Sequence, residues 1–194
     1  MAIQIKLIVG LGNPGAEYEH SRHNAGAWLL QTLAAREGVR LGVDSKLHAL
    51  LGKATLAGRP VWLARPTTFM NHSGRAVQAL LNYYRIEPER MLIVHDDLDL
   101  PPGVARLKYD GGHGGQNGLR DIMGQLGHGR FHRLRIGIGH PGDKNRVTPW
   151  VLGRPGVQDQ AAIVAAIDDA LAVLDRVITG ELEAAMQELH SPRG

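Results

Sequence analysis

The chain has 194 residues, which predicts a single domain over residues 1–194, and its 43% hydrophobic and 21% charged residues exclude wholesale disorder. It contains no cysteine, which excludes a disulfide framework, a thiol nucleophile and any zinc site with cysteine ligands. The 22 Lys and Arg residues outnumber the 19 Asp and Glu residues only slightly, so the net charge of +3 permits a polyanionic partner without requiring one.

Apolar runs and apolar residues at helical spacing alternate along the chain. In chain order they predict a strand at 4–10, a helix at 24–35, strands at 49–56 and 60–65, a helix at 73–84, strands at 91–95 and 104–108, a helix at 118–126, a strand at 134–138 and helices at 157–179 and 181–189. We expect Ser73 to cap its helix and Gly180 to end the long one. Residues 141–155 are the one candidate linker, and they are too few to separate two domains of real size.

The alternation of strands and helices is typical of an α/β protein. The turn predicted at 57–59 joins two strands as an antiparallel hairpin, so a purely parallel sheet is not expected. We therefore predict an α/β fold: a single domain with a twisted, mixed and largely parallel β-sheet flanked by helices. Ligands of such open sheets bind beyond the carboxyl ends of the strands, which points to residues 10–23, 95–99 and 111–117.

The first of these segments carries Gly10, Gly12 and Gly15 in the pattern G-x-G-x-x-G, which binds dinucleotides when it follows a strand. Pro14 argues against a nucleotide here, because it removes a backbone donor where a pyrophosphate would need one. The helical pattern also begins about eight residues too late for the third glycine to open a helix. We expect a tight turn that either binds nothing or presents the Asn13 amide to a ligand.

Residues suited to acid–base chemistry follow two of the predicted strands. His23 lies near the start of a helix, whose N-terminus lowers the pKa of an imidazole and keeps it neutral and able to accept a proton. Asp96, at the end of the strand 91–95, could hold such a histidine in one tautomer and stabilise its protonated form. Two alternatives stay open: a structural histidine beside a solvated acidic loop, and a metal site made of His20, His23 and Asp96, although no H-E-x-x-H-like spacing supports the metal.

Five glycines within residues 111–118 lead into a helix. Backbone N–H groups exposed at a helix start suit an anion or a developing oxyanion, and the alternative is a mobile loop. Basic residues flank this loop, namely Arg106, Lys108, Arg120, Arg130, Arg133 and Arg135. Such a cluster predicts phosphate contacts, with ordinary surface charge as the alternative. There is no G-x-S-x-G elbow, so a hydrolase built this way would activate water directly or with a metal.

Five longer motifs occur in order along the chain: VGLGNPGAEYEHSRHNAG, RPTTFMNHSG, HDDLDLPPG, GGHGGQNGLRD and FHRLRIGIGHPG. Together they run from Leu7 to about Pro155, and on them the chain resembles the bacterial peptidyl-tRNA hydrolase family. The resemblance implies a monomeric α/β enzyme that needs no cofactor and no metal. It also implies a substrate, peptidyl-tRNA, whose ester between an N-blocked peptide and the 3′ ribose of tRNA is hydrolysed so that the tRNA is recycled.

The resemblance also assigns roles to residues that match the motifs. The catalytic base would be His23 and its orienting aspartate Asp96. The residues that would bind or position the substrate and its oxyanion are Asn13, Tyr18, Phe69, Asn71 and Asn117. Arg106, Lys108 and Arg135 are the expected contacts to tRNA phosphates.

One position departs from the family pattern, and one segment carries no motif. The family often has histidine just before the N-G-L asparagine, where this chain has Gln116, so a proton-transfer role there is in doubt. Residues 157–194 hold no diagnostic motif. Because no run approaches 18 apolar residues and the N-terminal apolar segment is too short for a signal peptide, we expect a cytoplasmic protein without a membrane partner. A non-catalytic RNA-binding module remains the rival from another functional class.

Overall fold

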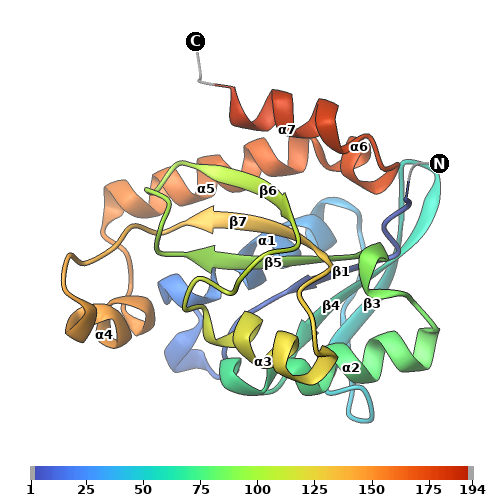
Figure 1. Cartoon of the computed structure of the whole chain (residues 1–194), viewed down its shortest axis with the longest axis horizontal. Coiled ribbons are helices and arrows are strands. Elements are labelled where there is room, and N and C mark those ends of the chain that lie inside the picture. Colours follow the sequence, from blue (N-terminus) through green and yellow to red (C-terminus); the bar gives the residue numbers. More distant parts are fainter. Residues whose placement is uncertain (1–2, 192–194) are drawn as a thin grey trace.

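The computed structural model describes residues 3–191, which form one seven-stranded mixed sheet with helices on both faces (Figure 1). The strands are β1 (Leu7–Gly10), β2 (Gly42–Asp44), β3 (Ala49–Leu56), β4 (Arg59–Pro66), β5 (Met91–Asp97), β6 (Ala105–Tyr109) and β7 (His132–Gly137). The helices are α1 (Ala25–Arg36), α2 (Ser73–Tyr84), α3 (Asn117–Leu126), α4 (Val147–Leu152), α5 (Val157–Ala172), α6 (Leu174–Ile178) and α7 (Leu182–His190). The predicted α/β class with a mixed sheet is confirmed.

The strands lie in the order β2-β3-β4-β1-β5-β7-β6. The central strands β4, β1, β5 and β7 run parallel, whereas β2, β3 and β6 pair antiparallel at the two edges. The predicted hairpin joins β3 to β4 through Ala57 (φ 51°) and Gly58 (φ 73°). Two positive φ angles give the turn the twist that neighbouring strands require.

The two faces of the sheet follow from side-chain alternation along the buried strands. Ile8 and Val94 point to the face covered by α1, α5, α6 and α7, whereas Val9 and Ile93 point to the face covered by α2 and α3. Figure 1 shows α2 and α3 on one side of the sheet and α5 to α7 on the other. Both faces are therefore covered by helices, which is why β1 and the first four residues of β5 are apolar.

The prediction that Ser73 caps α2 is wrong. A 3₁₀ turn at Met70–His72 leads directly into the helix, so Ser73 is already its first residue. The Ser73 hydroxyl donates to the carbonyl oxygen of Met70 at 2.7 Å instead of accepting a bond from the helix. The hydroxyl therefore fastens the turn that precedes α2.

The single helix predicted at 157–179 is two helices in the structure. The chain departs from helical geometry at Val173 (φ −101°, ψ 0°), and α6 then turns toward the end of the sheet. There the carbonyl of Ile178 accepts a bond from the backbone N–H of Ile5 at 3.0 Å. An apolar stripe cannot indicate this break, because Val173 itself is buried and keeps the helical spacing.

Two further elements differ from the prediction. The short edge strand β2 was not predicted, because the pattern at Gly42–Asp44 is exposed and too brief to give a signal. Residues 141–155, expected to be a linker, contain α4, which Figure 1 places beyond the carboxyl ends of β5 and β7. Pro149 lies in the first turn of α4, where proline is tolerated.

Glycines allow α1 to lie unusually close to the strands. A Cβ atom on Gly26 of α1 would stand 2.2 Å from the carbonyl oxygen of Val94, and one on Gly10 would stand 2.5 Å from the carbonyl oxygen of Gly26. Gly10, the first glycine of the G-x-G-x-x-G pattern, therefore allows the backbones of β1 and α1 to pack closely. This close approach puts the start of α1 directly over the carboxyl ends of β1 and β5.

We expect Gly26→Ala to lower the free energy of unfolding by about 3 kcal/mol, because the new methyl group must push α1 off the sheet. Gly124→Ala is the matched control, since Gly124 lies on the exposed side of α3 with open space around it. That variant should gain about 0.5–1 kcal/mol from helix propensity. Urea unfolding of the two proteins measures both values, and equal midpoints would refute the close packing.

Candidate active site

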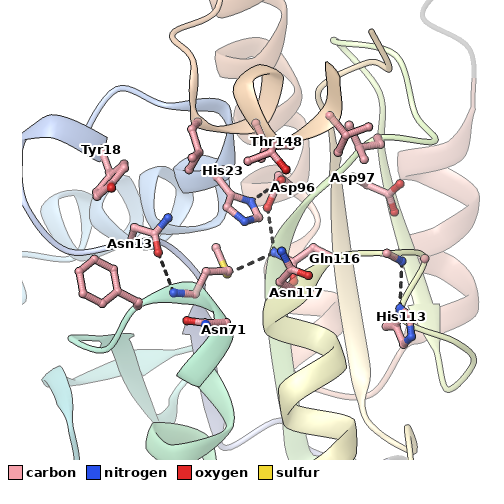
Figure 2. A pocket seen from close by; sticks show the side chains of 18 of the residues that line it. Asn13, Tyr18, His23, Asn71, Asp96, Asp97, His113, Gln116, Asn117 and Thr148 are labelled. Atoms are coloured by element: carbon pink, nitrogen blue, oxygen red, sulfur yellow. Dashed lines mark hydrogen bonds and ion pairs between the residues drawn. The ribbon is translucent and has the colours of Figure 1, made fainter. Parts of the chain in front are cut away.

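A pocket of about 460 Å³ opens where the parallel strands β4, β1 and β5 end (Figure 2). Its lining comes from the loops after these strands, from the start of α3 and from α4. Seven residues singled out from the sequence line it, namely Asn13, Tyr18, His23, Phe69, Asn71, Asp96 and Asn117. The ligand site expected at the carboxyl ends of the strands is thus present as a cavity.

His23 and Asp96 form a buried pair in this pocket. Nδ1 of His23 lies 2.8 Å from Oδ2 of Asp96, and the two residues are 5% and 2% exposed. Because an ionised carboxylate only accepts hydrogen bonds, Nδ1 carries the proton and donates it. Nε2 is then the unprotonated ring nitrogen, and nothing in the described part of the chain bonds to it.

The expectation that a helix N-terminus lowers the pKa of His23 is wrong in its net direction. Burial does lower this pKa, but the negative charge of Asp96 and the hydrogen bond to it raise it by more in total. The pKa of His23 therefore lies above its ordinary value of 6.5. The pair holds a histidine that is a better proton acceptor than a free imidazole.

Asn13 presents one end of its amide to the pocket. Its Oδ1 accepts a bond from the backbone N–H of Met70 at 2.6 Å, which leaves Nδ2 as the donor on the open side (Figure 2). Asn24 fixes the backbone below it: Oδ1 of Asn24 accepts from the N–H of Asn13 at 2.8 Å, and Nδ2 donates to its carbonyl at 3.0 Å. Asn13 is therefore held at both its backbone and its side chain.

Asn71 and Asn117 are exposed side chains at the rim of the pocket, one from the turn before α2 and one from the first position of α3. Oδ1 of Asn117 accepts from Arg120 at 3.3 Å, so the Nδ2 hydrogens of Asn117 remain as donors. Tyr18 and Phe69 also line the pocket and meet edge to face, with ring centroids 6.4 Å apart. Phe69 is 54% exposed, which leaves an aromatic surface at the pocket mouth.

The helix α4 forms an apolar wall that the sequence did not predict. Four of its residues line the pocket, namely Val147, Thr148, Val151 and Leu152. Arg22, next to His23, holds this wall: its guanidinium lies 3.5 Å from the centre of the Trp150 ring and donates to the carbonyl of Trp150 at 2.9 Å. The N–H of Arg22 also bonds to the carbonyl of Gly153 at 3.0 Å.

A second pocket of about 260 Å³ adjoins the first, and Asp97, His113 and Gly114 line both. Lys108 and Arg135 lie in this second pocket. Nε of Arg135 donates to Asp97 at 2.7 Å, so part of its charge is already neutralised.

Two further basic residues, Arg106 and Arg133, differ in their placement, and Arg133 lines the second pocket together with Lys108 and Arg135. Arg106 lines neither of the two pockets found in the described part of the chain, although it lies opposite Arg135 in the pairing of β6 with β7. The buried Arg133 donates to the carbonyls of Gly111, Gly112 and Gly129, and so anchors the glycine-rich loop. Arg133 therefore stabilises the loop and adds little to the positive charge exposed at the surface.

Neither a metal cluster nor a membrane span is found in residues 3–191. No three His, Asp or Glu side chains in this range stand close enough together to hold a metal ion, so His20 does not complete a site with His23 and Asp96. No helix in the same range has both the length and the apolar character to cross a membrane.

The contacts of three side chains that shape the site were not predicted from the sequence: those of Arg22, of Asn24 and of Gln116, although Gln116 was noted as a departure from the family pattern. All three are polar yet at most 7% exposed, and all three bond to residues distant in sequence. Arg22 and Asn24 flank His23 directly, and this cluster of polar residues around one candidate is the signal that could have identified them.

Comparison with known proteins identifies the chain's relatives. The family model described as peptidyl-tRNA hydrolase matches residues 7–194. The chain is 58% identical over 189 residues to a peptidyl-tRNA hydrolase of Xanthomonas oryzae pv. oryzae, covering 97% of both chains, and 56% identical to that of Stenotrophomonas maltophilia, covering 97% and 98%. The crystal structure of the Acinetobacter baumannii peptidyl-tRNA hydrolase superposes with a TM-score of 0.95 at 46% identity, over 100% of this chain and 98% of that one. The chain therefore belongs to the peptidyl-tRNA hydrolase family.

Proposed function

We propose that this protein hydrolyses the ester that joins an N-blocked peptide to the 3′ ribose of tRNA. The family supports the reaction, and the observation that carries the proposal is the buried His23–Asp96 pair in a pocket large enough for the end of a substrate. An ester has a better leaving group than an amide, so no covalent nucleophile is needed.

His23 acts as the general base in this scheme. Its Nε2 takes a proton from water as the water oxygen attacks the ester carbonyl, a role that contributes roughly 10²–10⁴-fold. Asp96 accepts from Nδ1 throughout, which fixes the tautomer and stabilises the imidazolium as it forms. The imidazolium then returns the proton to the ribose 3′ oxygen as the carbon–oxygen bond breaks, so the products are a peptide acid and free tRNA.

The asparagines position the substrate. An Nδ2 donor of Asn71 or Asn117 stabilises the oxyanion, an effect of about 2.7–4 kcal/mol where such a donor is preorganised. Nδ2 of Asn13 donates to a carbonyl of the peptide near its blocked amino end. A free ammonium would lose hydration in this neutral site, which favours N-blocked substrates. Tyr18 and Phe69 offer aromatic faces to the 3′ end of the tRNA.

The tRNA lies across the second pocket, where Lys108 and Arg135 contact phosphates, with Arg106 as an outlying contact on the same strand. The scheme uses residues of one chain and no cofactor, in keeping with the monomeric, cofactor-free enzyme that the resemblance to the family implies. Its substrate arises where translation occurs, which makes the cytoplasm the expected compartment and the recycling of tRNA from stalled or aborted synthesis the expected role.

A cleavage assay on N-acetyl-aminoacyl-tRNA in the presence of a chelator tests the proposal. We expect hydrolysis of the blocked substrate at full rate, and much slower hydrolysis of the same tRNA with a free amino group. Loss of activity with the chelator would favour a metal-dependent hydrolase. Binding of the tRNA with an intact ester would favour a non-catalytic RNA-binding module.

The variant His23→Ala should abolish turnover and leave tRNA binding intact, because the imidazole accepts the proton but does not hold the tRNA. The expected loss in kcat is about 10²–10⁴-fold. Single-turnover assays measure the rate and filter binding measures the affinity. Near-normal cleavage by this variant would exclude His23 as the base.

The variants Lys108→Ala and Arg135→Ala should each raise KM about tenfold. Each should also make the negative slope of the logarithm of the tRNA association constant against log salt less steep by about 0.7–0.9, as the loss of one phosphate contact does. Lys46→Ala is the control, since Lys46 is exposed in the loop between β2 and β3, at the opposite edge of the sheet. Salt titrations of tRNA binding give the slopes. A slope that matches the control would remove that residue from the tRNA contacts.

The variant Asp96→Asn should move the pKa of His23 below its ordinary value, because the charge that raises this pKa is lost while the burial that lowers it remains. The acidic limb of the kcat/KM profile should then move to lower pH, and the plateau should fall by about 10⁴-fold as the tautomer is no longer held. NMR titration of the His23 ring measures the pKa directly. A pKa that rises or stays constant would contradict this account of the pair.

A further inference from the structure

We propose that Gln116 is a positioning residue for this hydrolysis: it binds the second oxygen of Asp96 and so fixes the carboxylate that holds His23. The inference rests on the proposed function and extends it to a residue at which this chain departs from the family's frequent histidine.

Every polar atom of the Gln116 amide is used. Nε2 donates to Oδ1 of Asp96 at 2.9 Å and lies 3.3 Å from Sδ of Met70, while Oε1 accepts from the backbone N–H of Leu119 at 2.8 Å. Figure 2 shows the resulting chain of contacts from His23 through Asp96 to Gln116. The side chain is 7% exposed, so water does not compete for these bonds.

The contacts determine which end of the amide faces Asp96. With the nitrogen and oxygen exchanged, Oε1 would face the carboxylate and Nε2 would face the N–H of Leu119. Both contacts would then pair like with like, acceptor with acceptor and donor with donor. Gln116 is therefore a donor to Asp96 in this arrangement.

Gln116 completes the hydrogen bonding of a buried anion. Oδ2 of Asp96 is bonded by His23 and Oδ1 by Gln116, in a carboxylate that is 2% exposed. A buried carboxylate oxygen without a hydrogen-bond donor lowers the stability of the fold. Loss of the donor also leaves the carboxylate of Asp96 free to rotate away from the imidazole. Removing the donor would also leave more negative charge to act on His23.

The same amide ties the pair to the start of α3. Gln116 is the N-cap residue of α3, and its side chain accepts from Leu119 in the first turn. Asn117, the proposed oxyanion donor, is the next residue along the chain. One side chain thus sets the distance between the base and the group that would stabilise the oxyanion.

An amide performs this task without changing its charge with pH, which a histidine at the same position would not. The other titratable side chains that line the pocket are Tyr18, His72, Asp97 and His113. Arg22 points away from the pair toward α4, and Asp97 is paired with Arg135. The pH dependence at low pH should therefore report the titration of the His23–Asp96 pair.

The test compares Gln116→Met, Gln116→Glu and the control Asp121→Ala. Methionine keeps the length of the side chain but removes both the donor and the cap, whereas glutamate keeps an acceptor for Leu119 and places a second carboxyl beside Asp96. Asp121 anchors α3 to the N–H of Gly74 at 2.7 Å and does not touch Asp96, so its loss loosens the helix alone.

We expect Gln116→Met to lower kcat roughly tenfold with KM within about twofold, as the loss of one hydrogen bond to a charged group implies. The pKa of His23, followed by NMR, should rise by about half a unit, and the acidic limb of kcat/KM should move with it. Gln116→Glu should raise this pKa at least as much, and it should also lower the thermal stability because it places two carboxyl groups side by side in a buried position. Asp121→Ala should lower the stability and leave the pKa unchanged.

A double-mutant cycle that combines Gln116→Met with Asp96→Asn decides whether Gln116 acts through Asp96. In that background, Gln116→Met should no longer move the pKa of His23. A shift that persists there, a shift equalled by Asp121→Ala, or an unchanged pKa in both Gln116 variants would overturn the proposal. Because the NMR titration needs no turnover, it tests Gln116 even if His23→Ala should retain activity and the proposed function should fail.

Discussion

The buried contact between His23 and Asp96 is the interaction on which the rest of the site depends. The two residues are 73 positions apart in sequence, and the fold brings them to 2.8 Å by pairing β1 with β5 in parallel. Gly26 then lets α1 lie close enough to β5 for the preceding turn to reach the end of that strand. The geometry of a hydrogen bond is thus set by backbone packing in the centre of the sheet.

Two neighbouring carboxylates at the carboxyl end of β5 lie in different electrostatic environments. Asp96 and Asp97 are neighbours, yet one pairs with a histidine inside the first pocket and the other with Arg135 at the second. The first pocket is lined by amides, aromatic rings and apolar α4, and the second carries the positive charge. The proposed chemistry on a neutral ester and the proposed attraction of a polyanion are therefore assigned to different sides of one strand, because successive side chains of a strand point in opposite directions.

The sequence predicted most of the sheet and the location of the site, because buried strands and the helices on either face leave strong periodic signals. The seven residues expected to act as base, orienting aspartate or substrate contacts all line one pocket. Topology explains this for six of them, which lie at or after the carboxyl ends of the parallel strands β1, β4 and β5. Asn117 instead reaches the pocket through the glycine-rich loop that follows the antiparallel edge strand β6. The sequence could not predict α4 as a wall, the break at Val173 or the bonds of Gln116. Each of these depends on contacts between distant segments, and the sign of the pKa shift at His23 depends on a partner that only the fold supplies.

Arg22 and His23 belong to the same 3₁₀ turn, yet one holds the α4 wall and the other faces the proposed chemistry. Two contacts join this turn to α4 and the residue after it: the guanidinium of Arg22 with Trp150, and the backbone N–H of Arg22 with the carbonyl of Gly153. The wall of the pocket and the imidazole of His23 are therefore connected through one short turn of backbone. A substitution of Trp150 removes a contact of the residue next to His23, although Trp150 itself does not line the pocket.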